Sequence, residues 1–199
     1  MIPSIIGIAG SGFGCGKDTV GQMLAPFGYR RKAFADVLKN EVAEFTLGRV
    51  SPTLLPDHFY SVANAKIFTD VVAAIIHRED PSAKPTSPRM RRILQHWGTE
   101  LRRAQDKDYW VKRAEISVGD CFTDVRFPNE VSAIKNAGGA MIWVYNPRID
   151  TVNAHASENS VSEQDCDITV VNDGTLEQLR ESVEAAIWRL RLSAYSEAA

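Results

Sequence analysis

The feature that most constrains this sequence is a glycine-rich segment, residues 10–19 (GSGFGCGKDT), between an apolar run and a helical stretch. The apolar run, residues 4–9, has β-branched residues at its centre and predicts a buried parallel strand. Residues 18–24 predict a helix that ends before Pro26. Glycines let a backbone curl around a phosphate so that several N–H donors converge on it. The sequence therefore predicts a phosphate-binding loop at a strand-to-helix turn, for which a glycine-rich turn that binds nothing is the alternative.

Within this loop, the residues depart in two places from the usual pattern G-x-x-x-x-G-K-[ST]. Lys17 is expected to reach the β- and γ-phosphates of a nucleotide, but Asp18 occupies the place of the hydroxyl residue next to Mg²⁺, and Thr19 comes one position later. Ser11 occupies the place of the first glycine, so the loop either starts with serine or is one residue longer and starts at Gly10. We expect ATP and phosphate binding by Ser11, Gly12, Gly14, Gly16, Lys17, Asp18 and Thr19, with Asp18 and Thr19 also near the metal.

Strands and helices alternate along the rest of the chain. Further strands are predicted at residues 30–33, 121–125, 140–145 and 168–171. Helices are predicted at residues 37–47, 65–78, 89–103, 109–118 and 175–192, with one more that is opened by Pro128 and closed by Gly138-Gly139. This order predicts an α/β fold of three layers, in which a five-stranded parallel sheet has helices on both faces. We expect one domain over residues 1–199, with a helical insert at about 36–118 and a short lid at about 146–163.

Composition excludes several classes of partner. The net charge of −2 and the pI near 6.1 argue against a stable nucleic-acid partner. No apolar run approaches the roughly 20 residues of a membrane span, and the first residues lack the basic start of a signal peptide. The three cysteines have neither metal-ligand spacing nor a disulfide pattern. A cytoplasmic location is therefore expected, and a homodimer is left open.

Two segments of the predicted insert carry candidate acceptor-binding residues. Asp36 follows the second predicted strand, where it can face an acceptor or a metal-bound water, or simply cap a helix. Arg92, Gln95 and Thr99 recur at helical spacing within a basic cluster, residues 89–103. An arginine can bind a phosphate through two hydrogen bonds, and a glutamine can pair with a base edge. The alternative for this cluster is a basic helix that is exposed to solvent.

Two further segments carry candidates for stabilising transferred phosphate. Asp124 and Arg126 stand at the end of the third predicted strand, where they can order Mg²⁺ through water and meet phosphate charge, or form a structural pair. Arg148 lies in the polar segment that we interpret as a lid, which could bring it to the phosphoryl group and exclude water. A surface loop with scattered charges remains the alternative for this segment.

With these residues in place, the chain resembles the bacteriophage deoxynucleoside monophosphate kinase family. The resemblance rests on the matching pieces Gly16-Lys17-Asp18-Thr19, Phe34-Ala35-Asp36 with Leu38-Lys39, Gln95-x-x-Gly98-Thr99-Glu100, Asp124-Val125-Arg126-Phe127-x-Asn129-Glu130 and His155-x-Ser157-Glu158. It implies a P-loop kinase fold, ATP with Mg²⁺, a deoxynucleoside 5′-monophosphate (dNMP) as acceptor, and a phage origin, hence the host cytoplasm. It also adds Lys39 and Glu158 to the acceptor-binding candidates. Dephospho-coenzyme A kinase is a more distant relative.

The prediction for function is an in-line transfer of the γ-phosphoryl group of ATP to the 5′-phosphate of a dNMP, giving the diphosphate. Lys17, Arg126, Asp36 and Arg148 are the predicted catalytic residues, and Asp124 joins Asp18 and Thr19 as a metal candidate. The acceptor phosphate is already ionised, so no strong general base is required. The alternatives are a P-loop kinase for another acceptor, such as dephospho-coenzyme A or a polynucleotide end, and a P-loop NTPase or nucleotide-binding module.

Overall fold

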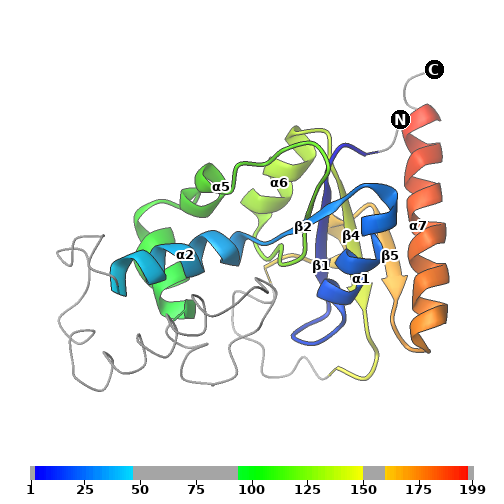
Figure 1. Ribbon diagram of the computed structural model, residues 1–199, viewed down its shortest axis with the longest axis horizontal. Coiled ribbons are helices and arrows are strands. Elements are labelled where there is room, and N and C mark those ends of the chain that lie inside the picture. Colours follow the sequence, from blue (N-terminus) through cyan, green and yellow to red (C-terminus); the bar gives the residue numbers. More distant parts are fainter. Residues whose placement is uncertain (1–2, 47–93, 150–159, 197–199) are drawn as a thin grey trace. The chain divides into compact units, whose positions relative to one another are not determined.

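The computed structural model describes residues 3–46, 94–149 and 160–196 of the chain (Figure 1). The predicted helix at residues 65–78 lies outside the described residues, and so do Arg92 and Glu158.

A parallel sheet forms the centre of the fold (Figure 1). Its five strands are β1 (Ile6–Gly10), β2 (Arg30–Lys32), β3 (Asp120–Phe122), β4 (Ala140–Tyr145) and β5 (Ile168–Val171). They lie in the order β2-β3-β1-β4-β5, and every pairing is parallel. The predicted α/β class and the five-stranded parallel sheet are therefore confirmed. Because β1 lies in the middle, its apolar residues are buried on both faces, as its uninterrupted apolar run predicts.

Helices cover both faces of this sheet, which confirms the three layers. On one face, α1 (Lys17–Met23) and α7 (Leu176–Ser196) pack over Ile6 and Ile8 of β1. On the other face, α6 (Pro128–Asn136) brings Ile134 against Gly7, where an added side chain would overlap it. Alternate residues of β1 therefore face opposite helical layers, as the period of a strand requires.

Several boundaries differ from the prediction. Helix α2 (Phe34–Thr46) begins three residues earlier than predicted, while β3 ends at Phe122 because the chain turns at Thr123. Helix α5 (Tyr109–Arg113) ends well before residue 118, since Glu115 has a positive φ of 45°. The predicted helix at residues 89–103 is described from residue 94, and His96–Arg103 is a π-helix.

The chain divides into two compact units. The first, Met1–Phe34 with Ala114–Ala199, contains the sheet, α1, α6 and α7. The second, Ala35–Arg113, contains most of α2, the π-helix and α5. Of the helices in the described ranges, none has the length and apolar character to cross a membrane. Cys15, Cys121 and Cys166 are free, as predicted, and burial raises the pKa of the Cys121 thiol to about 12.

Candidate active site

The glycine-rich segment connects β1 to α1 as a six-residue loop, residues 11–16. Gly10 is the last residue of β1 and pairs with Val144 of β4, so it belongs to the strand. Ser11 begins the loop: its N–H donates to the carbonyl of Val144 (3.0 Å), and its Oγ accepts from the N–H of Asn146 (3.1 Å). The loop therefore starts with serine and has the usual length, which resolves the alternative left open by the spacing.

Gly16 has a conformation and surroundings that only glycine suits. Its φ of 111° lies in the left-handed region, and α1 begins at the next residue. A Cβ atom on Gly16 would lie 2.5 Å from Nδ2 of Asn172, so any side chain would displace that amide. The turn into α1 thus depends on close packing between the loop and the residue that follows β5.

The ammonium group of Lys17 is held by the loop itself. Its Nζ donates to the carbonyl of Gly12 (2.8 Å) and lies 3.4 Å from Sγ of Cys15. The side chain is half-buried, and its positive charge lies beside the carbonyl of Gly12. This is the arrangement that can bind the phosphates of a nucleotide.

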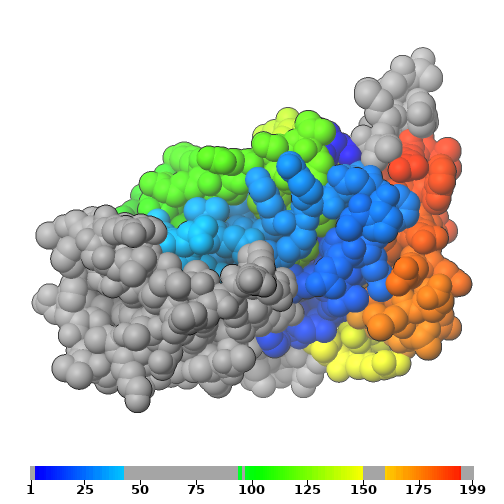
Figure 2. All heavy atoms as spheres, in the orientation of Figure 1, coloured from blue at the N-terminus to red at the C-terminus, as the bar shows by residue number. Residues whose placement is uncertain are grey.

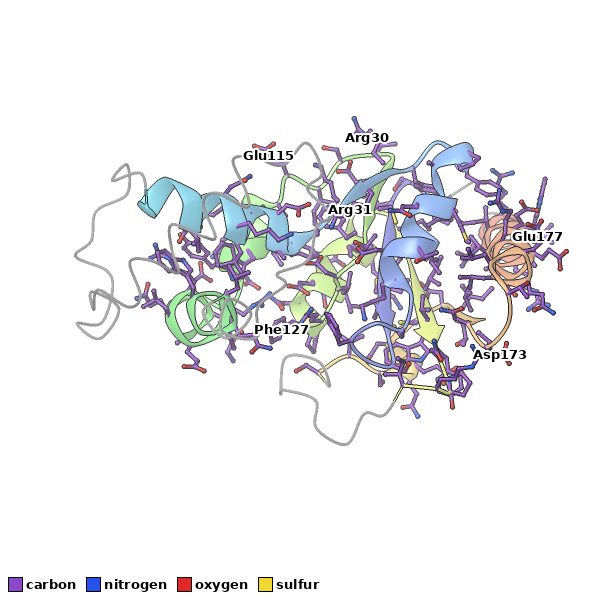
Figure 3. All side chains as sticks on the ribbon, turned by 60° about the horizontal axis from the view of Figure 1, so that its bottom comes forward. Arg30, Arg31, Glu115, Phe127, Asp173 and Glu177 are labelled. Carbon is purple, nitrogen blue, oxygen red and sulfur yellow. The ribbon has the colours of Figure 1, made fainter. Side chains whose placement is uncertain are left out.

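Asp18 joins α1 to the end of β3. Its Oδ1 accepts from the hydroxyl of Thr123 (2.7 Å), and Nη2 of Arg31 lies 3.8 Å from the same oxygen. Figure 3 labels Arg31, which belongs to β2. The absence of a side chain on Gly21 permits this approach, since a Cβ there would lie 2.3 Å from Cγ2 of Thr123. Asp18, which replaces the usual hydroxyl residue, therefore accepts a hydrogen bond from a hydroxyl on the turn that follows β3.

The segment after β3 holds Asp124 and Arg126 in fixed backbone positions. Oδ1 of Asp124 accepts from the N–H of Phe34 (2.8 Å), which ties the end of β3 to the start of α2. The buried carboxylate of Glu130 accepts from the N–H groups of Arg126 (2.8 Å) and Phe127 (3.1 Å), so it caps α6. Both predicted residues thus stand at the carboxyl edge of the sheet, where open α/β folds bind their ligands.

Arg148 lies at the same edge, after β4. Its backbone N–H donates to Oδ1 of Asn146 (2.9 Å), and its side chain donates to the carbonyl of Asp173, which Figure 3 labels. Figure 2 shows the segment after β4 (yellow) beside the first part of the loop (dark blue). Asp18, Asp124, Arg126 and Arg148 therefore all lie at or near the carboxyl ends of β1, β3 and β4.

Asn172 is a site residue that sequence reasoning missed. It directly follows β5, and its Nδ2 donates to the carbonyl of Cys15 (2.8 Å), which holds the loop one residue before Gly16. Its position directly after a predicted strand could have indicated a site residue, because the carboxyl ends of parallel strands lie at the edge of the sheet where ligands bind.

The second unit carries the remaining described candidates. Asp36 and Lys39 lie on α2 and form an ion pair of 3.4 Å. Gln95 directly precedes the π-helix and Thr99 lies within it, and both are half-buried. Among the described residues, neither the amide of Gln95 nor the hydroxyl of Thr99 has a hydrogen-bond partner, which leaves both groups able to bind a ligand.

We expect Asn172→Ala to raise the KM for ATP about fivefold while the acceptor KM stays within about twofold of wild type. Loss of one hydrogen bond to a neutral group costs about 1 kcal/mol, and here the bond holds the loop that is predicted to bind phosphate. Steady-state kinetics with each substrate varied in turn would measure this. Thr169→Ala is the matched control, because it removes a hydrogen bond from the same strand to Glu163 on the surface. An unchanged ATP KM in Asn172→Ala would show that the loop keeps its shape without this bond.

Comparison with known proteins identifies a family for this chain. The family described as deoxynucleotide monophosphate kinase matches residues 41–183. A protein of Acanthamoeba polyphaga mimivirus is 27% identical over 205 residues, which cover 92% of this chain and 95% of the relative. The deoxynucleotide monophosphate kinase of Enterobacteria phage T4 is 30% identical over 105 residues, covering 48% of this chain and 44% of that protein.

Among solved structures, a dephospho-CoA kinase from Campylobacter jejuni matches 94% of this chain and 97% of its own, with 14% identity and a TM-score of 0.47. The family match over residues 41–183 covers more than half of the chain. This chain belongs to the deoxynucleotide monophosphate kinase family.

Proposed function

We propose that this protein transfers the γ-phosphoryl group of ATP to the 5′-phosphate of a deoxynucleoside monophosphate. The observation that carries the proposal is the loop of residues 11–16, in which the ammonium of Lys17 is held against the carbonyl of Gly12. Membership of the family supports the dNMP as acceptor. Its relatives in phage T4 and mimivirus support a viral origin, and with it action in the host cytoplasm.

The residues of the first unit would bind and stabilise phosphate. The loop amides and Lys17 bind the β- and γ-phosphates, and Arg126 and Arg148 meet the charge that spreads over the transferred group. The side chain of Arg148 would then donate to a phosphate oxygen in place of the carbonyl of Asp173. Asp36 orients the acceptor, since the acceptor oxygen is ionised and needs no strong base.

The oxygen ligands at this edge of the sheet fit Mg²⁺. Asp18 and Thr19 come from α1, and Asp124 follows Thr123, whose hydroxyl donates to Asp18. Carboxylate and hydroxyl oxygens suit this ion, which binds proteins through one or two carboxylates and keeps several waters. When bound, Mg²⁺ neutralises the charge of the phosphates.

The second unit would bind the acceptor and select its base. Gln95 and Thr99 present half-buried polar groups that have no partner within the described residues, and such groups discriminate strongly between bases. Arg92 and Lys39 would bind the acceptor phosphate, which is common to every dNMP, and Glu158 would complete the acceptor site. We therefore propose activity on a subset of bases, with a smaller preference for 2′-deoxyribose over ribose.

A panel of acceptors tests this proposal. We expect ATP-dependent formation of diphosphates from some deoxynucleoside monophosphates, and little from dephospho-coenzyme A or a short single strand. Gln95→Ala should change the order of accepted bases, whereas Arg92→Ala should weaken all of them about equally. Competition assays with the natural deoxy- and ribonucleoside monophosphates would measure both. An equal loss of activity on all bases in Gln95→Ala would show that residues other than Gln95 select the base.

The same panel separates the alternatives. Preference for dephospho-coenzyme A or a polynucleotide end would overturn the proposal that a dNMP is the acceptor. It would leave the assignment as a P-loop kinase unchanged. ADP release that does not depend on any added acceptor would instead indicate an NTPase.

A further inference from the structure

The helix His96–Arg103 of the second unit is a π-helix of eight residues. Such helices are rare, usually extend over a single turn and occur frequently at functional sites. Their hydrogen bonds join residues five positions apart and close a wider turn than in an α-helix. A π-helix of this length therefore requires contacts that favour the wider turn over the α-helical alternative.

Two buried residues of this helix are five positions apart, which is the spacing of π-helical hydrogen bonds. In an α-helix with 3.6 residues per turn, residues five positions apart differ in direction by about 140°. In the wider turn they differ by only about 50°. Trp97 and Arg102 are separated by five positions, and both are buried, with 1% and 5% of their surface exposed. The wide turn is what brings these two residues to one side.

Glu41 of α2 binds both of these side chains through one oxygen. Its Oε1 accepts from Nε1 of Trp97 (2.9 Å) and from Nε of Arg102 (2.6 Å), while its Oε2 accepts from the hydroxyl of Tyr109 (2.5 Å). Burial, assisted by Glu41, raises the pKa of Tyr109, so this hydroxyl remains a donor at neutral pH. A single oxygen can hold Trp97 and Arg102 together only if they lie on one side of the helix.

Further contacts hold the same side of the helix. The carbonyl of Gly98 accepts from the buried Nε1 of Trp110 (2.9 Å), and a Cβ on Gly98 would lie 3.1 Å from Leu38 of α2. The guanidinium of Arg102 lies 5.8 Å from the ring centre of Trp97 and 5.1 Å from that of Tyr109. Both α2 and α5 therefore pack on the side that carries Arg102.

The type of helix determines whether Arg102 lies on the same face as Gln95. Gln95 and Thr99 are four positions apart and stay within about 40° of each other in either helix type. Arg102 follows Gln95 by seven positions, so in an α-helix it would lie within about 20° of Gln95. In the π-helix it is turned away from Gln95 by about 145°. The wide turn thus separates a cation from the face that carries Gln95 and Thr99.

We infer that Glu41 is a positioning residue that keeps this helix in its π form, and so keeps Arg102 off the face that presents Gln95 and Thr99 to the acceptor. The inference rests on the proposed function, in which that face reads the base. Without the carboxylate, the turn reverts to the α form and Arg102 comes to lie beside Gln95. The cation then competes with the base for the amide of Gln95. Glu41 thereby acts on acceptor selectivity without contact with the acceptor.

The test combines Glu41→Gln with a rescue variant. Glu41→Gln keeps the shape of the side chain and removes its charge, and we expect the acceptor KM to rise about tenfold with a changed order of bases. The ATP KM should stay within about twofold, a split that general destabilisation would not give. Arg102→Met in the Glu41→Gln background removes the released cation and should return the acceptor KM to within about threefold of wild type. The NMR signal of the Trp97 indole N–H should move in both variants, since its acceptor has changed.

Two more variants make the outcome decisive. Arg102→Lys lacks the Nε donor but keeps the charge, so it should reproduce the rise in acceptor KM, even if Glu41→Gln does not fold. Lys112→Ala is the control, because it breaks only the exposed ion pair with Asp106 in the same unit. Wild-type acceptor KM and base order in both folded variants would overturn the inference and leave the proposed function standing. A wild-type enzyme that phosphorylates no nucleoside monophosphate would overturn both.

Discussion

Replacement of Lys17 by alanine is expected to lower the rate of phosphoryl transfer by about 10³-fold, at the upper end of what loss of one preorganised donor costs. The reason is that the ammonium, held beside the carbonyl of Gly12, places a positive charge next to the loop. The variant loses one hydrogen bond of about 1 kcal/mol, so the melting temperature should fall by no more than about 4 °C. Turnover assays and a circular-dichroism melt would measure the two effects.

Lys135→Ala is the matched control for this variant. Lys135 lies on the surface and pairs with Asp167, so its loss should leave transfer unchanged. If Lys17→Ala retained a tenth of the wild-type rate, the lysine would not have the proposed phosphate role.

Arg126→Ala should lower kcat by about 10³-fold and change the KM of either substrate much less, because an arginine that meets transition-state charge acts on turnover. Glu130 holds the backbone N–H of Arg126, so the substitution removes the side chain and leaves the chain in place. Single-turnover and steady-state kinetics together would separate chemistry from binding.

Arg180→Ala, which removes an exposed arginine paired with Glu177, is the control for this second variant. A rise in the acceptor KM alone, at wild-type kcat, would make Arg126 a ground-state ligand.

The sheet could be predicted from the sequence because each strand is specified by its own residues. Ala140–Tyr145 and Ile168–Val171 were predicted with their observed bounds, since short apolar runs bounded by polar residues behave as buried strands in most contexts. The end of α6 was also predictable, because Gly138 adopts a φ of 76° just after the helix. Local patterns of this kind determined the fold class.

Features that depend on distant residues could not be predicted in this way. The π-helix is held by Glu41, which precedes Trp97 by 56 positions, and no local pattern indicates such a contact. The hydroxyl that binds Asp18 comes from Thr123, 105 positions later. Helix α5 ends at Arg113 although the residues that follow suit a helix, because Glu115 takes a positive φ and Ser117 donates its N–H to Asp120 of β3. The predicted residues stand near one edge, but the contacts that hold them there were missed.

The order of the strands has a consequence for synthesis on the ribosome. β1 is made first, yet its neighbours in the sheet are β3 and β4, and the loop after it takes a hydrogen bond from Asn172, 157 positions later. Pairings at such separation form slowly because a long chain must first be closed. The loop therefore gains the bond that Asn172 donates only after β5 is made. Chaperones that shield apolar segments would protect β1 during that interval.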